Sequence, residues 1–143
     1  MIQKAPEQAI LGIAGTPPPS VRERLLLSDF KLFENAPEII DRHRALLNGE
    51  SEGKTAQQIA TICFRRLIER SPHDRTAVMG LSAEHVESFR RAGGAVIAFA
   101  LPGEPLVERP TDTKLPRLFT IEALNGSEDA MRRFSSIVLD ITS

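Results

Sequence analysis

A run of seven apolar residues, 95–101, constrains the fold of this chain more than any other feature. Gly94 precedes the run and Pro102-Gly103 follows it, and a short apolar run between such residues is typical of a β-strand. Because the run contains no polar position, we expect a strand that is covered on both of its faces.

Two later segments show the alternation of a β-strand. In residues 118–124 and 136–142, apolar side chains at every second position would lie on one face of a sheet. Between the two segments, Ser127 is expected to begin a short helix that runs to Phe134. The C-terminal part of the chain therefore predicts a sheet.

The residues before these segments are spaced as in helices. Ser20 and Thr55 each precede a Glu or Gln by three positions, which is the spacing of a capping box. The helix predicted for residues 55–70 is the best defined, because its apolar residues form one stripe. Two further helices are expected to begin near Pro37 and at Ser82.

Helices first and strands last is the order typical of an α+β protein. We therefore predict N-terminal helices packed on a C-terminal, mainly antiparallel sheet of about three to four strands. A length of 143 residues suits one domain. Residues 20–143 are expected to form this domain, and residues 1–19 an N-terminal arm, because Pro17-Pro18-Pro19 interrupts any regular element.

Composition narrows the classes of function. The chain holds 18 Lys and Arg against 19 Asp and Glu, a formal net charge of −1, whereas non-specific nucleic-acid binding needs a positive field. The one cysteine cannot form an internal disulfide, and no apolar run is long enough to span a bilayer. We therefore expect a soluble, cytoplasmic protein.

Residues 49–55, Gly-Glu-Ser-Glu-Gly-Lys-Thr, are similar to a phosphate-binding P-loop. Measured against the pattern G-x-x-x-x-G-K-[ST], however, the loop is one residue short. It also follows a predicted helix instead of a buried strand, and Glu50 and Glu52 would repel a polyphosphate. A nucleotide-binding enzyme is therefore kept as an alternative, and we favour the absence of enzymatic activity.

No side-chain pattern predicts a metal site or a cofactor, since the three histidines do not share a ligand spacing. A ligand pocket, if the protein has one, is expected between the helix of residues 55–70 and the sheet. Its candidate residues are Cys63, Phe64, Phe89, Phe99 and Phe119, which are equally expected to form the core.

Pairs of adjacent arginines lie on three predicted helices. Their guanidinium groups could grip phosphate or carboxylate, and the alternative explanation is a solvated helix end. The candidate anion-binding residues are Arg65, Arg66, Arg90 and Arg91.

Short segments of the chain resemble parts of PAS-type sensor domains. Residues 32–37, Leu-Phe-Glu-Asn-Ala-Pro, resemble the opening helix of that family, and residues 118–142, which end in Asp-Ile-Thr, resemble its last two strands. Residues 72–75, Pro-His-Asp-Arg, resemble a turn of many members, whereas residues 38–70 do not match. The resemblance implies a sensory or regulatory module on an antiparallel sheet, often dimeric, and carries over no cofactor-binding residue.

We predict a small, non-enzymatic regulatory or binding module that acts through contacts with a ligand or a protein partner. A nucleic-acid-binding regulator that uses the paired arginines and a homo-oligomeric structural component are the further alternatives. We expect a homo-oligomer or a protein partner, and no membrane.

Overall fold

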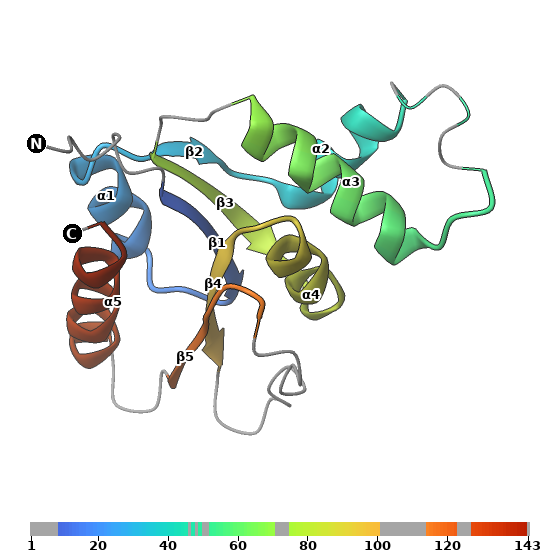
Figure 1. The fold of residues 1–143 in the computed structure, drawn as a ribbon. Coiled ribbons are helices and arrows are strands. Elements are labelled where there is room, and N and C mark those ends of the chain that lie inside the picture. Colours follow the sequence, from blue (N-terminus) through green and yellow to red (C-terminus); the bar gives the residue numbers. More distant parts are fainter. Residues whose placement is uncertain are drawn as a thin grey trace, which may run out of the picture.

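The computed structural model describes residues 9–45, 47, 49, 52–70, 75–100, 114–122 and 127–142. Within these residues, five strands form one sheet, and helices pack against it (Figure 1). The strands are β1 (Ala9–Gly15), β2 (Lys31–Phe33), β3 (Arg75–Leu81), β4 (Ala95–Ala100) and β5 (Leu118–Glu122). The helices are α1 (Ser20–Leu27), α2 (Ala36–Arg44), α3 (Ala56–Glu69), α4 (Ala83–Arg91) and α5 (Ser127–Thr142).

The sheet is parallel throughout, with the strand order β2-β3-β1-β4-β5. β1 is its middle strand, and Leu11 pairs with Ala77 of β3 on one side and with Ala95 of β4 on the other. The described residues therefore form an α/β fold. The predicted α+β fold with a mainly antiparallel C-terminal sheet was wrong.

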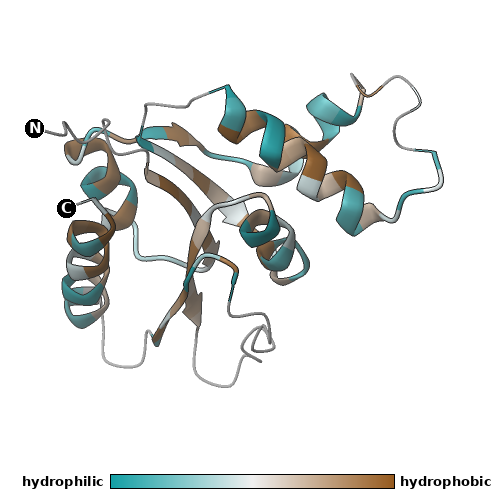
Figure 2. Cartoon of the chain, in the orientation of Figure 1, coloured by the Kyte–Doolittle hydropathy of each residue, from teal (hydrophilic) through white to brown (hydrophobic). Residues whose placement is uncertain are grey.

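Helices cover both faces of the sheet. α1 and α5 pack on one face, and α2, α3 and α4 pack on the other (Figure 1). Along β4, Val96 and Ala98 face the second group of helices, while Ile97 and Phe99 face the first. Figure 2 shows the strands as largely apolar between helices of mixed polarity. The expectation that this strand is covered on both faces is confirmed.

The helix boundaries follow the predicted signals in part. At the start of α3, Thr55 Oγ1 accepts the N–H of Gln58 at 3.1 Å, and Gln58 Oε1 accepts the N–H of Thr55 at 2.9 Å. This capping box is confirmed. The one predicted at Ser20 does not form, because α1 begins one residue earlier with Pro19 as its N-cap, which offers no side-chain acceptor.

Two segments differ from the prediction for physical reasons. Residues 9–15, predicted as part of an arm, form the middle strand, so the three prolines end β1 without separating it from the domain. Residues 136–142, predicted as a strand, belong to α5. The apolar residues of this segment fit both the two-residue period of a strand and the 3.6-residue period of a helix. The segment is helical because the apolar residues that precede it continue the helical period. The buried residues of α5 are Ala130, Phe134 and Val138.

Among the described helices, none combines the length and the apolar composition that crossing a membrane requires.

Candidate functional site

The topology indicates where a site is expected. In an open α/β sheet, ligands bind beyond the carboxyl ends of the strands, where neighbouring strands send their connections to opposite faces. Here β1 continues into α1 on one face, and the adjacent β3 continues into α4 on the other. The switch point therefore lies between the carboxyl ends of β1 and β3.

Apolar side chains pack over the middle strand next to the switch point. Leu81, the last residue of β3, and Phe89 of α4 pack over Gly12 of β1, and both side chains are buried. A Cβ atom on Gly12 would come within 2.9 Å of Phe89 Cδ1, and one on Gly94 within 2.7 Å of the same atom. Both glycines thus make room for the phenylalanine ring, and the space between these elements belongs to the core.

The histidines make local contacts. Ser82 Oγ lies 3.1 Å from Nδ1 of His85 in the first turn of α4. His43 is buried, and its Nδ1 lies 2.9 Å from the carbonyl oxygen of Ile39. His73 is outside the described residues. In the part of the chain that is described, His, Cys, Asp and Glu do not gather into a group of three that could hold a metal ion.

The structure does not bring the five candidate ligand residues into one pocket. Cys63, Phe64 and Phe89 are buried on the face covered by α2, α3 and α4, with the two rings edge to face at 5.2 Å between centroids. Phe99 is buried on the opposite face, and Phe119 packs beside that cluster. The sheet separates the two groups, and their role in ligand binding stays a prediction.

The Cys63 thiol contacts α2 from α3. Its Sγ lies 3.7 Å from the carbonyl oxygen of Ile40. Burial raises the pKa of the thiol, and the positive charges of Arg66 and Arg44 oppose this shift only in part. The thiol therefore behaves as a small buried apolar group at neutral pH.

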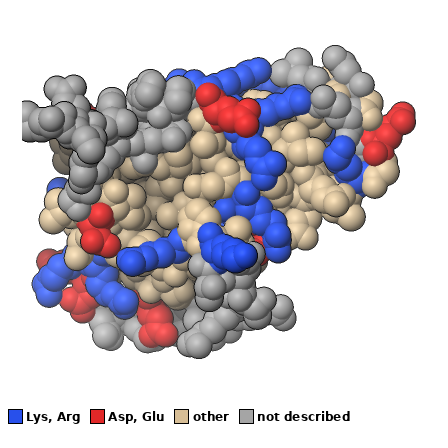
Figure 3. All heavy atoms as spheres, viewed as in Figure 1, with Lys and Arg blue, Asp and Glu red and all other residues tan. Residues whose placement is uncertain are grey.

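The four candidate anion-binding arginines lie on α3 and α4, which pack together. Arg65 Nη2 donates to the carbonyl oxygen of Arg91 at 3.2 Å. Arg90 is only 5% exposed, and its Nε donates to the carbonyl oxygen of Pro116 at 2.7 Å. Glu87 forms ion pairs with both Arg90 and Arg91, at 3.2 and 3.5 Å. Arg90 is therefore a structural anchor, although Figure 3 shows positively charged side chains gathered over these helices.

The P-loop-like segment connects two helices. α2 precedes it, α3 follows it, and Thr55 is engaged in the capping box of α3. Gly49 and Gly53 adopt positive φ values of 89° and 75°. Asn48, Glu50 and Ser51 lie outside the described residues. Because the segment follows a helix, it lacks the strand-to-helix context that a P-loop needs.

α1 carries exposed leucines. Its second half reads Leu25-Leu26-Leu27, in which Leu25 is buried while Leu26 and Leu27 are 47% and 78% exposed. Leu139 of the adjacent α5 is 69% exposed. These three side chains are the exposed large apolar residues of the described chain, and we name the pair on neighbouring helices, Leu27 and Leu139, the leucine surface.

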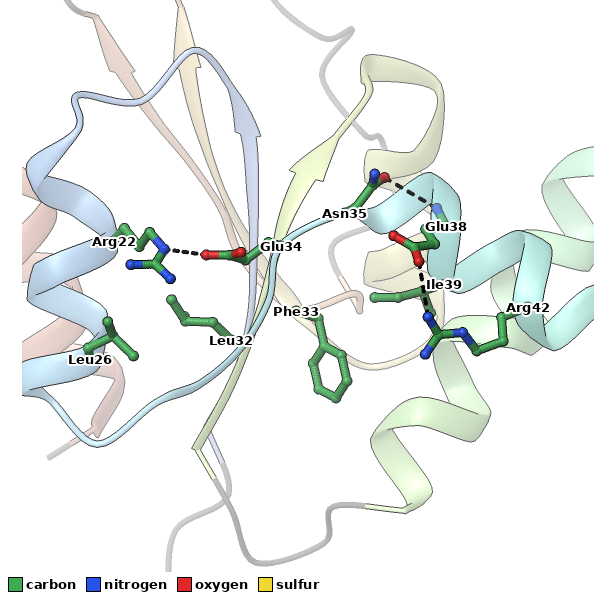
Figure 4. Close-up of a pocket in the computed structure, with 9 residues that line it drawn as sticks. All are labelled: Arg22, Leu26, Leu32, Phe33, Glu34, Asn35, Glu38, Ile39 and Arg42. Atoms are coloured by element: carbon green, nitrogen blue, oxygen red, sulfur yellow. Dashed lines mark hydrogen bonds and ion pairs between the residues drawn. The ribbon is translucent and has the colours of Figure 1, made fainter.

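A pocket on one side of α1, which we name the β2 groove, lies between α1, the edge strand β2 and α2 and has a volume of about 440 Å³ (Figure 4). Arg22 forms an ion pair with Glu34, and Arg42 forms one with Glu38 at 3.0 Å. Each charged side chain of the groove therefore has an internal partner. Its lining residues are Arg22, Leu26, Leu32, Phe33, Glu34, Asn35, Glu38, Ile39 and Arg42.

A second pocket, which we name the α1–α5 pocket, lies on the other side of α1 and has a volume of about 490 Å³. Arg24 Nε donates to Ser135 Oγ at 3.0 Å, and Arg75 Nη1 donates to the carbonyl oxygen of Ser28 at 2.9 Å. Neither arginine, nor Asp29 beside them, forms an ion pair within the described residues. The lining residues are Arg24, Leu27, Ser28, Asp29, Arg75, Ser135, Val138, Leu139 and Thr142.

Comparison with known proteins gives no relative: neither a family model, nor a curated protein, nor a solved structure matches the chain. The antiparallel sheet that the PAS resemblance implies is not the sheet of the described residues. Membership of that family itself stays an untested prediction. The fold and its surface thus define an α/β protein with two pockets beside α1.

Sequence reasoning missed the leucine surface, although a signal was present. Three consecutive leucines at residues 25–27 cannot all face the core from one helix, so one or two of them must be exposed. Leu139 was missed because the predicted strand placed it on the same face as Ile137 and Ile141.

Proposed function

We propose that the chain is a small non-catalytic binding module that docks a protein partner on the side formed by α1 and α5. The observation that carries this proposal is the leucine surface, where Leu27 and Leu139 expose most of their side chains on neighbouring helices. Exposed apolar patches of this kind mark docking sites. A partner that covers them gains about 25 cal/mol for each Å² of apolar area removed from water.

The switch point supports binding over catalysis. Leu81 ends β3 at the edge of the sheet where α/β enzymes place reactive groups, and its apolar side chain packs with Phe89 over Gly12 in the middle of β1. The module would therefore act through its surface. We extend the proposal to a regulatory role and to a cytoplasmic location, which the buried free thiol of Cys63 fits.

Site-specific photo-crosslinking tests this proposal. A photoreactive amino acid at position 27 should give a discrete crosslinked product in cells, because the partner covers this position. The matched control carries the same amino acid at Gln57, which is exposed on α3 at the opposite face of the sheet. Equal crosslinking from positions 27 and 57, or none from position 27, would contradict a docking site at the leucine surface.

A second candidate function is binding of a polyanion across α3 and α4. It is favoured by the contact that brings Arg65 beside Arg91 and by the cations gathered over these helices in Figure 3. It is weakened by Glu87, which already pairs with two of the arginines. Replacing both Arg65 and Arg91 by alanine should then reduce duplex DNA binding and its salt dependence. Absence of binding by the unmodified protein at low salt would eliminate this candidate.

A further inference from the structure

We propose that the partner is a second copy of this chain, which docks on the α1–α5 pocket across a two-fold axis beside Leu27 and pairs Arg24 of each copy with Asp29 of the other. This inference rests on the proposed function, because it names the partner of the same surface. Four observations on the pocket lead to it.

The first observation is that the pocket combines a hollow with projecting side chains. Leu27 and Leu139 line a volume of about 490 Å³ and also expose most of their own surface. In a two-fold interface, the same patch of both molecules meets, so a patch must be complementary to itself. A patch that holds both leucines and the hollow between α1 and α5 satisfies this condition, since leucines of one copy can enter the hollow of the other.

The second observation is the charge of the pocket. Arg24 and Arg75 each donate one hydrogen bond to an uncharged oxygen. Because a guanidinium has five N–H donors, both side chains can also donate to another molecule. Asp29 is exposed and has no cationic partner in the described chain. A purely acidic partner would leave Asp29 facing like charge, and a purely basic partner would do the same to the arginines. A second copy supplies both signs.

The third observation is that Asp29 is a poor choice for the stability of the monomer. It follows the C-terminus of α1 with φ 64°, its N–H donates to the carbonyl oxygen of Leu26 at 3.1 Å, and the N–H of Phe30 donates to that of Leu25 at 3.0 Å. These are the bonds of a Schellman motif, whose left-handed residue is favoured as glycine. A carboxylate at this place also faces the negative end of the helix dipole. A guanidinium from a second molecule would offset the unfavourable charge, which is the second of these disadvantages.

The fourth observation is the position of the charges along α1. Arg24 lies one turn before Leu27 on the same side of the helix, and Asp29 lies just beyond it. We consider two copies of α1 that run antiparallel across an axis beside Leu27. Arg24, which lies before the axis in one copy, then meets Asp29, which lies after the axis in the other copy. The symmetry therefore forms the Arg24–Asp29 pair twice.

Sedimentation velocity over a series of protein concentrations tests the dimer. We expect a monomer–dimer equilibrium between about 5 and 500 µM, in the range of modest interfaces. Leu27→Asp should shift it to monomer, whereas Gln57→Asp on α3 should leave it unchanged. A monomer at all concentrations, or a dimer that Leu27→Asp leaves intact, would overturn the proposal.

A charge exchange tests the pairing itself. Arg24→Asp and Asp29→Arg should each dimerise at least about tenfold more weakly, because like charges then meet across the axis. An equimolar mixture of the two variants should form a heterodimer, in which both aspartates of one copy, at positions 24 and 29, face arginines of the other. If the mixture stays monomeric, the Arg24–Asp29 pair is wrong.

One further variant keeps the test independent of folding. Asp29→Gly should raise the midpoint of thermal unfolding and weaken the dimer, a combination that a damaged fold would not produce. An unchanged dimer in this variant would count against the pair. The dimer and the proposed function can fail separately: a monomer that crosslinks from position 27 to a different protein removes the dimer alone, and a monomer without such a crosslink removes both.

Discussion

The ring of Phe89 lies directly against Gly12, so that a Cβ atom on this glycine would come within 2.9 Å of Phe89 Cδ1. Gly12 lies at the centre of the middle strand of the sheet, where it pairs with Val78 of β3 and Val96 of β4. The contact is therefore part of the core between the sheet and α4. It also makes this position sensitive to the addition of a single methyl group.

We expect Gly12→Ala to lower the free energy of unfolding by about 1–3 kcal/mol, the usual cost of overpacking a core. Urea denaturation measures the change. Leu81→Ala removes the other side chain that crowds this position, so the double variant should lose less stability than the sum of the single losses. Strict additivity would show that Leu81 and Gly12 do not share this space.

Asp29→Gly should raise the free energy of unfolding of the monomer by about 1 kcal/mol. Glycine adopts a positive φ without strain, and the change removes a negative charge from the C-terminal end of α1. Asp29→Ala is the matched control, since it removes the charge and keeps a Cβ atom in the left-handed conformation. A gain of equal size in both variants would assign the whole effect to the charge.

Sequence patterns predicted individual elements where one period was clear. The helix predicted for residues 55–70 is α3, and the predicted strand is β4 as far as Ala100, beyond which Leu101 lies outside the described residues. Each has a long apolar pattern with marked ends. The direction of the strands could not be predicted in this way. Alternation and apolar runs show that a segment is extended, and they do not show which strand it pairs with or in which direction.

The missed parts of the fold and of the candidate site have different causes. In the fold, β3 was missed because Thr76 and Gly80 interrupt the apolar pattern that a buried strand would show. The candidate site was missed because it depends on exposure and conformation. The role proposed for Asp29 depends on a positive φ and on the absence of an ion pair within the described chain. Neither property can be recognised from a short sequence motif.

Arg90 and Arg91 are adjacent in sequence and should respond differently to the same substitution. Arg90→Ala removes a buried guanidinium that holds the carbonyl oxygen of Pro116, so we expect a loss of about 2 kcal/mol, typical of a hydrogen bond to a charged group. Arg91→Ala removes an exposed ion pair and should cost less than about 0.5 kcal/mol. Chemical denaturation of both variants measures the difference, and equal losses would contradict the assignment of Arg90 as an anchor.

Thr76→Val should stabilise the protein. Thr76 is 1% exposed in β3, and its Oγ1 has no hydrogen-bond partner within the described residues. Valine has the same shape without the buried hydroxyl, so we expect a gain of about 1 kcal/mol in the free energy of unfolding. Thr120→Val, in the half-buried edge strand β5, is the control and should change stability by less than about 0.5 kcal/mol. A loss of stability in Thr76→Val would mean that the hydroxyl has a partner.

The thiol of Cys63 should make stability depend on pH in the alkaline range. Burial raises its pKa in the folded protein above the value of an unfolded thiol, so the folded state holds the proton more tightly. The resulting stabilisation is fully present below the unfolded pKa, and it is lost as the pH rises from that value through the folded pKa. The free energy of unfolding, measured by denaturant at several alkaline pH values, should therefore fall as the pH rises.

Cys63→Ala should be less stable at neutral pH, because a cavity replaces the sulfur atom. It should lack the part of this alkaline decrease that the thiol causes. An identical alkaline slope in Cys63→Ala would show that other groups cause it.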